Sequence, residues 1–364
     1  MARDQRAGCG KSLGPQPVIG GLVLRCDATP TMGAGHLMRC LALGQAWVAR
    51  GGRILVVKAP EMPSLESRIV DCGGLVDVVD AAPGSIEDAR FTVAAATAFA
   101  ARCVVVDGYH FGSGYHRAIV DAQLRLALID DLGGQQVWGA DVVINQNIYA
   151  VSTLYPYRDE RTKLLLGTKF ALLRREFCRW ADAASPRGHS LRRLLITLGG
   201  SDPENVTLKV MQGLALMPRL PEQVVVVSGP GNPHLSTLQS AAERAGGRFK
   251  ILTDVLDMAR LMTECGAAVS GAGSTTWELA FMGLPAALLV LAENQRGIAE
   301  GMAAEGAAVN LGWHHLLSAS DLATMIAEWL SDEPRLRRMS ARGRELVDGM
   351  GAMRVVDALL ELGA

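Results

Sequence analysis

The sequence has few features that would tie the chain to a membrane, a nucleic acid or an oxidising compartment. Its seven cysteines are scattered, odd in number and form no C-x-x-C pair. This argues against a disulfide framework or a zinc site, and for reduced thiols in the cytoplasm. A net charge of -1 provides no broad basic field for nucleic-acid binding. No apolar run approaches the length of a membrane span, so we expect no stable membrane anchoring.

The length and the apolar content predict two domains. At 364 residues, 49% of them hydrophobic, the chain is too long for one ordinary core and can fill two. Residues 1–17 contain no apolar core of signal-peptide length, and we interpret them as a loose tail. Small and polar residues at 181–190 indicate a linker between an N-terminal domain, 18–180, and a C-terminal domain, 191–364.

Short runs rich in β-branched residues alternate with stretches of helical apolar spacing in both halves. In the first half the runs lie at 18–25, 53–58, 103–107, 125–130 and 141–144. In the second half they lie at 191–198, 224–228, 249–253, 267–270, 284–291 and 307–311. This alternation predicts a parallel sheet with helices on both faces in each half. The predicted fold class is therefore α/β, with two Rossmann-like, doubly wound domains facing a cleft.

Two glycine-rich loops, each between a predicted strand and a predicted helix, are candidates for phosphate binding. One contains Gly33-Ala34-Gly35-His36, and the other is Ser270-Gly271-Ala272-Gly273-Ser274-Thr275. Glycines let the backbone approach a ligand closely, and the start of the following helix attracts an anion. Neither loop matches the dinucleotide or P-loop pattern, so no cofactor is expected. Alternatively, the Thr275-x-x-Glu278 spacing is that of a capping box, which would only close a helix start.

Polar residues follow several predicted strands and would meet at the same edge of each sheet. They include Asp107-Gly108-Tyr109, Asp130-Asp131 and Glu293-Asn294-Gln295. Acidic residues at strand ends can instead bond their local backbone, which is the alternative for Asp107 and Asp130. Asn294 can either cap the helix that begins there or face the cleft with Gln295.

His36 is the candidate general base. It lies at a predicted helix start, where the positive end of the helix dipole disfavours an imidazolium and leaves a ring able to accept a proton. A phosphate contact or a capping role is the alternative. Tyr109 can position a water or a sugar hydroxyl, or it can pack as an ordinary tyrosine at the rim.

The order of these motifs resembles a known family. The motifs are Arg25-Cys26-Asp27, Gly33-x-Gly35-His36-x-Met38-Arg39-Cys40, Val106-Asp107-x-Tyr109, Ile129-Asp130-Asp131-Leu132, Asn145-Gln146-Asn147, Gly167-x-x-Phe170-Ala171-Leu172-Leu173-Arg174, Leu198-Gly199-Gly200-Ser201-Asp202-Pro203 and Glu293-Asn294-Gln295. From about residue 20 to about residue 315, the chain resembles the pseudaminic-acid pathway hydrolases, which act on UDP-2,4-diacetamido-2,4,6-trideoxy-β-L-altropyranose. Relatives of that family include spore-coat polysaccharide proteins, and its fold is similar to that of the GT-B glycosyltransferases.

The resemblance implies a metal-independent hydrolase that releases UDP and a free N-acetylated deoxy sugar for nonulosonic acid biosynthesis. We assign catalysis to His36 and Tyr109, and the resemblance places Glu278 at the ribose and the backbone around Asp254 to Leu256 at the uracil. The implied substrate-binding residues are Gly33, Gly35, Arg39, Asp107, Gly200, Ser201, Val255, Gly273, Ser274, Thr275, Glu278, Asn294 and Gln295. No His, Cys or carboxylate cluster has ligand spacing, so no metal is expected.

Two other functions are compatible with this fold and these motifs. A GT-B glycosyltransferase that uses a UDP-N-acetyl sugar in polysaccharide or glycan synthesis would use His36 to deprotonate a sugar acceptor in place of water. A non-catalytic binder would hold the UDP-sugar without turnover. The fold alone does not separate these functions, because the site determines the reaction.

Overall fold

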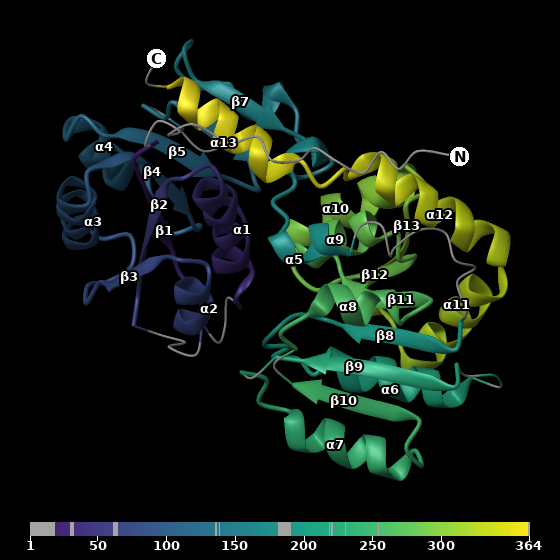
Figure 1. Cartoon of the computed structure of the whole chain (residues 1–364). Helices are drawn as coiled ribbons and strands as arrows, with labels where there is room; N and C mark the ends of the chain where they lie inside the picture. The colour runs from purple at the N-terminus through teal and green to yellow at the C-terminus, as the bar shows by residue number, and fades with distance from the viewer. Residues whose placement is uncertain are drawn as a thin grey trace, which may run out of the picture.

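The structure is a computed structural model that describes residues 19–29, 33–60, 65–134, 137, 139–180, 191–217, 219, 221–229, 231–253 and 255–362. The predicted tail at 1–17 and the predicted linker at 181–190 lie outside these residues. The described residues form two parallel sheets, each flanked by helices (Figure 1). The predicted fold class, with two doubly wound α/β domains, is confirmed.

The first sheet has seven strands in the order β3-β2-β1-β4-β5-β6-β7, counted over the described residues. The strands are β1 Gly21–Cys26, β2 Arg53–Lys58, β3 Leu75–Val78, β4 Ala101–Asp107, β5 Arg125–Ile129, β6 Val142–Asn145 and β7 Lys163–Leu166. The helices are α1 Gly35–Ala49, α2 Glu66–Asp71, α3 Ile86–Ala98, α4 Ser113–Asp121 and α5 Arg175–Arg179, with short 3-10 helices η2 Ser152–Leu154 and η3 Thr168–Phe170.

The second sheet has six strands in the order β10-β9-β8-β11-β12-β13, again over the described residues. The strands are β8 Arg193–Thr197, β9 Gln223–Ser228, β10 Phe249–Thr253, β11 Ala267–Gly271, β12 Ala286–Val290 and β13 Ala308–Trp313. The helices are α6 Val206–Leu216, α7 Leu235–Arg244, α8 Met258–Thr263, α9 Thr275–Met282, α10 Glu293–Ala304, η4 His314–Leu316, α11 Ala319–Ser331, α12 Glu333–Leu346 and α13 Gly351–Glu361.

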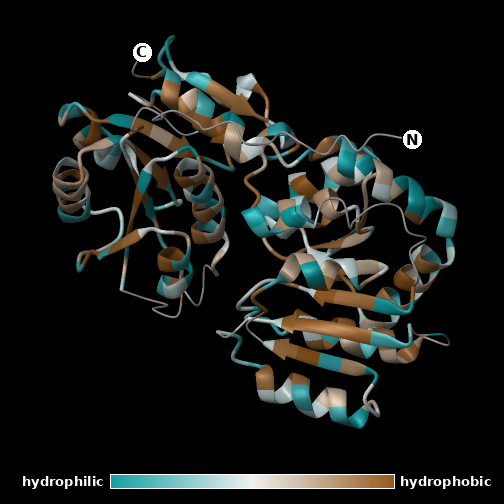
Figure 2. Cartoon of the chain, viewed as in Figure 1, coloured by the Kyte–Doolittle hydropathy of each residue, from teal (hydrophilic) through white to brown (hydrophobic). Residues whose placement is uncertain are grey.

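Helices cover both faces of each sheet, which explains why the strands read as nearly continuous apolar runs (Figure 2). In β1, Leu22 and Leu24 pack in the same cluster as α1, whereas Val23 points to the opposite face, toward α3 and α4. The second sheet is covered by α8, α9 and α10 on one face and by α6, α7 and α11 on the other.

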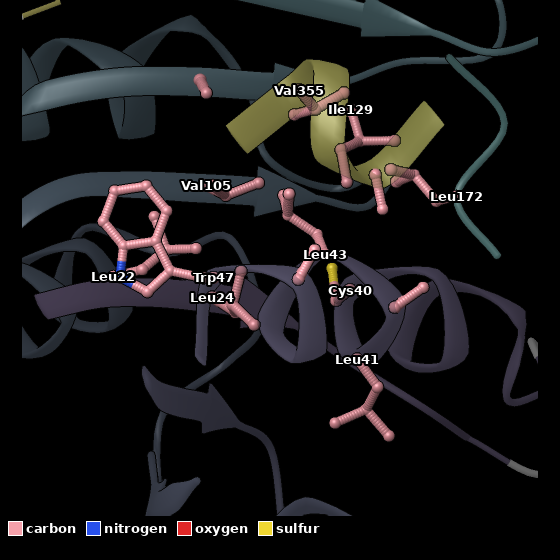
Figure 3. Close-up of a cluster of buried hydrophobic side chains, with 14 of the residues drawn as sticks. Leu22, Leu24, Cys40, Leu41, Leu43, Trp47, Val105, Ile129, Leu172 and Val355 are labelled. Carbon is pink, nitrogen blue, oxygen red and sulfur yellow. The ribbon is translucent and has the colours of Figure 1, made fainter. Parts of the chain in front are cut away.

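The last helix, α13, packs on the first sheet although it follows the second sheet in the sequence (Figure 1). Val355 and Leu359 are fully buried in the core cluster that also contains α1, and Figure 3 shows Val355 beside Ile129. Where the chain crosses, a β-carbon on Gly351 would lie 2.2 Å from the Ala171 carbonyl oxygen. The predicted domain ranges stay a prediction, and residues 351–361 add to the core of the first sheet.

Each sheet has a point where the strand order reverses, between β1 and β4 in the first sheet and between β8 and β11 in the second. Ligands of open α/β sheets bind outside the carboxyl ends of the strands at such points. His36 follows β1 and Asp107 ends β4, while Gly199-Gly200 follows β8 and the second glycine loop follows β11. The topology therefore brings the predicted site residues to the edges where a ligand is expected.

Candidate active site

A cavity of about 350 Å³ lies between the carboxyl ends of the two sheets. Its wall combines residues that follow β1, β4 and β5 of the first sheet with the loops that follow β8, β11 and β12 of the second. The predicted residues that line it are Gly33, Gly35, His36, Arg39, Tyr109, Gly200, Ser201, Gly273, Ser274, Thr275, Asn294 and Gln295. The structure thus brings together predicted residues that lie up to 262 positions apart in the sequence, from Gly33 to Gln295.

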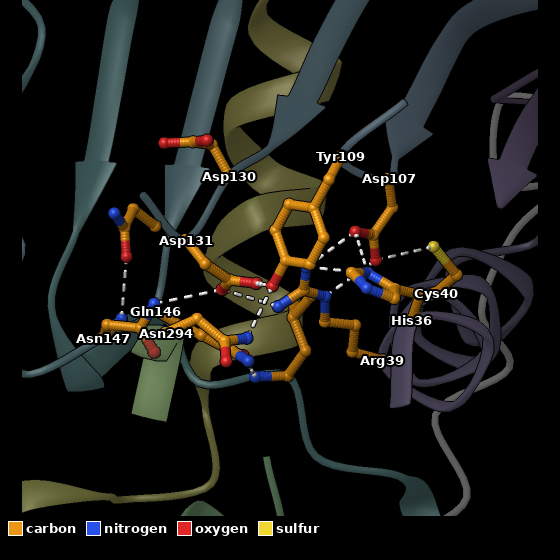
Figure 4. A network of polar contacts seen from close by, with 12 residues as sticks. His36, Arg39, Cys40, Asp107, Tyr109, Asp130, Asp131, Gln146, Asn147 and Asn294 are labelled. Atoms are coloured by element: carbon orange, nitrogen blue, oxygen red, sulfur yellow. Dashed lines mark hydrogen bonds and ion pairs between the residues drawn. The ribbon is translucent and has the colours of Figure 1, made fainter. Parts of the chain in front are cut away.

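His36 lies in the first turn of α1 and is held by Asp107 at the end of β4 (Figure 4). His36 Nδ1 lies 2.7 Å from Asp107 Oδ1. Because an ionised carboxylate can only accept a hydrogen bond, we assign the hydrogen to Nδ1. This leaves Nε2 to accept a proton from a group in the cavity.

Asp107 supports this arrangement from behind. It is fully buried and accepts hydrogen bonds from Arg39 Nε at 2.7 Å and from Arg39 Nη2 at 2.6 Å. Burial acts to raise the pKa of Asp107, but the charges and hydrogen bonds of Arg39 and His36 outweigh it and hold that pKa well below its ordinary value. The predicted role of Asp107 as a substrate contact is corrected here, because its partners on α1 hold it outside the lining of the cavity.

Tyr109 connects the first sheet with the second. Its hydroxyl donates to Asp131 Oδ2 at 2.8 Å and accepts from Asn294 Nδ2 at 2.9 Å. Burial and the charge of Asp131 raise the pKa of Tyr109 above its ordinary value, so the hydroxyl keeps its hydrogen. The capping alternative for Asn294 is wrong, because α10 begins at Glu293 without a side-chain cap and Asn294 faces the cavity.

Asp131 is a site residue that sequence reasoning placed at the rim but did not include among the substrate contacts. It lines the cavity and accepts from Arg39 Nη1 at 2.7 Å and from Asn147 Nδ2 at 3.0 Å. Its neighbour Asp130 accepts from the Gly133 backbone N–H at 2.7 Å, which confirms the local backbone bond predicted for it. Figure 4 shows the two carboxylates well separated.

The second glycine loop reaches the cavity at the start of α9. Ser274 and Thr275 line the cavity where the helix begins, so the helix N-terminus is available to an anion. The predicted capping box is wrong: α9 has no side-chain cap, and the Glu278 carboxylate accepts from Arg174 Nη2 at 3.1 Å instead. Gln295 accepts from the Leu291 backbone N–H at 3.1 Å while lining the same wall.

A second cavity, of about 240 Å³, adjoins the first along the loops at 199–201 and 274–275. Glu278 and Val255, the two residues predicted to contact the nucleoside, both line it. Asp254, the first residue of the predicted uracil contact, lies outside the described residues. Arg174 also lines this cavity, and sequence reasoning assigned it no role.

His314 is another cavity residue that sequence reasoning missed. It follows β13 directly and lines the first cavity, and burial lowers its pKa. No glycine loop or motif marks it, and its place after a strand end is the only signal that could have found it.

Across the described ranges, no group of three or more His, Cys, Asp or Glu residues is arranged to hold a metal ion. The helices in the same ranges are all too short or too polar to cross a membrane.

Comparisons with known proteins show relationships in sequence and in fold. No model of a known protein family matches the chain. The chain is 28% identical to the spore coat polysaccharide biosynthesis protein SpsG of Bacillus subtilis over 247 residues, which cover 66% of this chain and 71% of SpsG. A second relative is the UDP-N-acetylglucosamine--N-acetylmuramyl-(pentapeptide) pyrophosphoryl-undecaprenol N-acetylglucosamine transferase of Alkalilimnicola ehrlichii. The two sequences are 32% identical over 163 residues, and these residues cover 43% of this chain and 45% of that protein.

Among solved structures, MurG of Acinetobacter baumannii superposes with a TM-score of 0.65, covering 94% of this chain and 99% of that one. The chain has the GT-B fold. At 15% identity this likeness establishes the fold alone. The predicted similarity to GT-B proteins and to a spore-coat polysaccharide protein is thereby confirmed.

Proposed function

We propose that this chain is an enzyme that binds a UDP-linked N-acetylated sugar between its two sheets and breaks the bond between the anomeric carbon and UDP. The observation that carries the proposal is the geometry of His36. Its Nδ1 is fixed by the buried Asp107, and its ring lines the same cavity as the start of α9. A candidate base and a candidate diphosphate site therefore share one space.

In this proposal UDP occupies the second cavity, with its diphosphate at the start of α9. The helix N-terminus and the loop amides carry the negative charge of the departing UDP, so neither an acid nor a metal is required. Glu278 lies where it can accept from the ribose hydroxyls, and the chain at Val255 borders the uracil. The name of the Alkalilimnicola ehrlichii relative, which includes UDP-N-acetylglucosamine, supports this choice of nucleotide.

The sugar then lies in the first cavity, within reach of His36. Nε2 of His36 takes a proton from the attacking oxygen, and Asp107 stabilises the imidazolium that results. The oxygen forms a bond to the anomeric carbon as the bond to UDP breaks. A single displacement of this kind inverts the anomeric configuration.

Glycosyl transfer is the reaction that the comparisons favour. SpsG is named for polysaccharide biosynthesis, and the Alkalilimnicola ehrlichii protein is named as an N-acetylglucosamine transferase. The attacking oxygen would then belong to a sugar acceptor, and the product would be a step in surface polysaccharide or glycan synthesis.

Hydrolysis is the second candidate, and the geometry of Tyr109 favours it. The Tyr109 hydroxyl donates its hydrogen to Asp131, so toward a nucleophile its oxygen can only accept a hydrogen bond. His36 Nε2 can likewise only accept, because the hydrogen is on Nδ1. Water can donate to both acceptors, whereas an alcohol has one hydrogen to give. The motif order also resembles the pseudaminic-acid pathway hydrolases, in which case the product is a free sugar for nonulosonic acid synthesis.

An acceptor-dependence experiment tests the proposal and separates the two reactions. The purified chain is incubated with a panel of UDP-linked acetamido sugars, with and without sugar or lipid-linked acceptors, and UDP and sugar products are quantified by mass spectrometry. Transfer predicts UDP release only with an acceptor, and hydrolysis predicts equal amounts of UDP and free sugar without one. UDP binding with no turnover on any substrate would identify a binder and contradict the proposed catalysis.

A further inference from the structure

An ion pair between the two halves of the chain lies in the wall of the second cavity. Arg174 lies between η3 and α5, in the segment that follows the first sheet, and Glu278 lies on α9. Arg174 Nη2 is 3.1 Å from Glu278 Oε1, with only 9% and 15% of the two side chains exposed. Both residues line the cavity.

The surroundings of Arg174 fix the direction of its guanidinium. It forms a second ion pair with Glu176, and its guanidinium carbon lies 5.2 Å from the centroid of the Phe177 ring. A planar guanidinium held on several sides presents its hydrogen bonds in one geometry. Arg174 therefore acts as a rigid support for the carboxylate that it contacts.

This support has two consequences for Glu278. Arg174 occupies Oε1, which leaves Oε2 as the oxygen that can accept from a ligand in the cavity. Burial raises the pKa of Glu278 above its ordinary value, and the charge and hydrogen bond of Arg174 limit that rise. A carboxylate oxygen held toward the cavity in this way has two lone pairs and can accept both hydroxyl hydrogens of a vicinal diol.

We infer that Arg174 is a positioning residue for ribose recognition, because it holds Glu278 so that the remaining oxygen meets the 2′ and 3′ hydroxyls of a ribonucleotide. The inference rests on the proposed function, in which the second cavity holds UDP. A 2′-deoxyribonucleotide removes one of the two donors and leaves a buried charge less well satisfied. Since Arg174 belongs to the first half of the chain, selection of ribose depends on contact between the two halves.

Binding of UDP and of 2′-deoxy-UDP to the full chain, measured by titration calorimetry, tests this inference. The unaltered protein should prefer UDP by about tenfold or more, as expected when a buried charged acceptor loses a donor. Arg174→Gln should reduce that preference to within about twofold. Arg174→Lys should keep part of the preference, because lysine has the positive charge but not the planar set of N–H donors of a guanidinium. The exposed neighbour provides the matched control, Arg175→Gln, which should keep the preference of the unaltered protein.

The outcomes separate this inference from the proposed function. A folded Arg174→Gln protein that prefers UDP by the original factor overturns the inference, and so does an unaltered protein that binds UDP and 2′-deoxy-UDP equally well. If Arg174→Gln does not fold, Arg174→Lys and Glu176→Gln carry the test, and an unchanged preference in both overturns it. An unaltered protein that does not bind UDP at all overturns the proposed function and this inference together.

Discussion

The Tyr109 hydroxyl accepts a hydrogen bond at 2.9 Å from the side-chain amide of Asn294, which belongs to the other sheet's α10. One turn farther along α10, a β-carbon on Gly297 would lie 2.6 Å from Tyr149 Cδ1. Tyr149 in turn donates to the Asp131 backbone carbonyl at 2.7 Å. The start of α10 is thus seated closely against the chain that carries the residues around His36.

Removing the Tyr109 hydroxyl should reduce kcat and leave UDP affinity unchanged. Tyr109→Phe removes the bonds to Asp131 and Asn294 together, for which we expect a loss of about 10- to 100-fold in kcat. If Tyr109 and Asn294 act as a unit, the double variant Tyr109→Phe/Asn294→Ala loses no more than the worse single variant. Steady-state kinetics of the three variants checks this, and fully additive losses would show that the two residues act independently.

Glu278→Ala should weaken the binding of UDP in a protein that remains folded. Glu278 lines the second cavity and its carboxylate does not cap α9, so its removal takes away the proposed contact with ribose and not a helix cap. Calorimetric titration with UDP, together with a melting curve, measures both effects. An unchanged affinity for UDP combined with a lower Tm would mean that Glu278 stabilises the fold and does not contact the nucleotide.

Activity should not depend on a divalent metal. Within the described part of the chain no cluster of metal-binding side chains is present, and in the proposed complex the N-terminus of α9 faces the diphosphate. UDP release from the substrate, assayed after treatment with EDTA, should keep its original rate. Loss of activity that is restored by Mg²⁺ or Mn²⁺ would refute this expectation.

The buried His116 on α4 should make the protein less stable in mild acid. Its Nδ1 has no hydrogen-bond partner among the described residues, and burial lowers the pKa of His116 from 6.5 to about 4. The unfolded chain therefore binds this proton more readily, and stability is lost as the pH falls from about 6.5 through 4, by up to about 3 kcal/mol. Urea unfolding at pH 7 and pH 4.5 should show a smaller loss in His116→Leu than in the unaltered protein, and an equal loss in both would refute the assignment.

Much of the fold could be predicted because central strands of a parallel sheet are buried on both faces and read as apolar runs. Two strands at the edges of the first sheet, β3 and β7, were missed. Each has four residues, and Leu75 and Val78 at the ends of β3 are exposed, so the apolar signal is weak. Periodicity also shows that α13 has an apolar face, but it does not reveal that this face returns to the first sheet.

The candidate site could be predicted in part for a similar reason. Strand ends and glycine loops locate the edge of a sheet, which is why His36 and Thr275 line the predicted cavity. The sequence does not show which way each side chain turns at that edge. Asp130 and Asp131 are adjacent, yet only Asp131 faces the cavity, and the buried partners of Asp107 come from a helix distant in sequence.

The central claim, that His36 is the base that activates the attacking oxygen, is tested most directly by the kcat of His36→Asn. The exposed His315 provides the matched control, His315→Asn. Loss of a general base should reduce kcat by about 10²- to 10⁴-fold in His36→Asn, while UDP affinity stays within a few-fold because the nucleotide is assigned to the second cavity. His315→Asn should keep its rate. A His36→Asn protein that keeps more than about a tenth of the original kcat, or whose main defect is in UDP binding, would contradict the account.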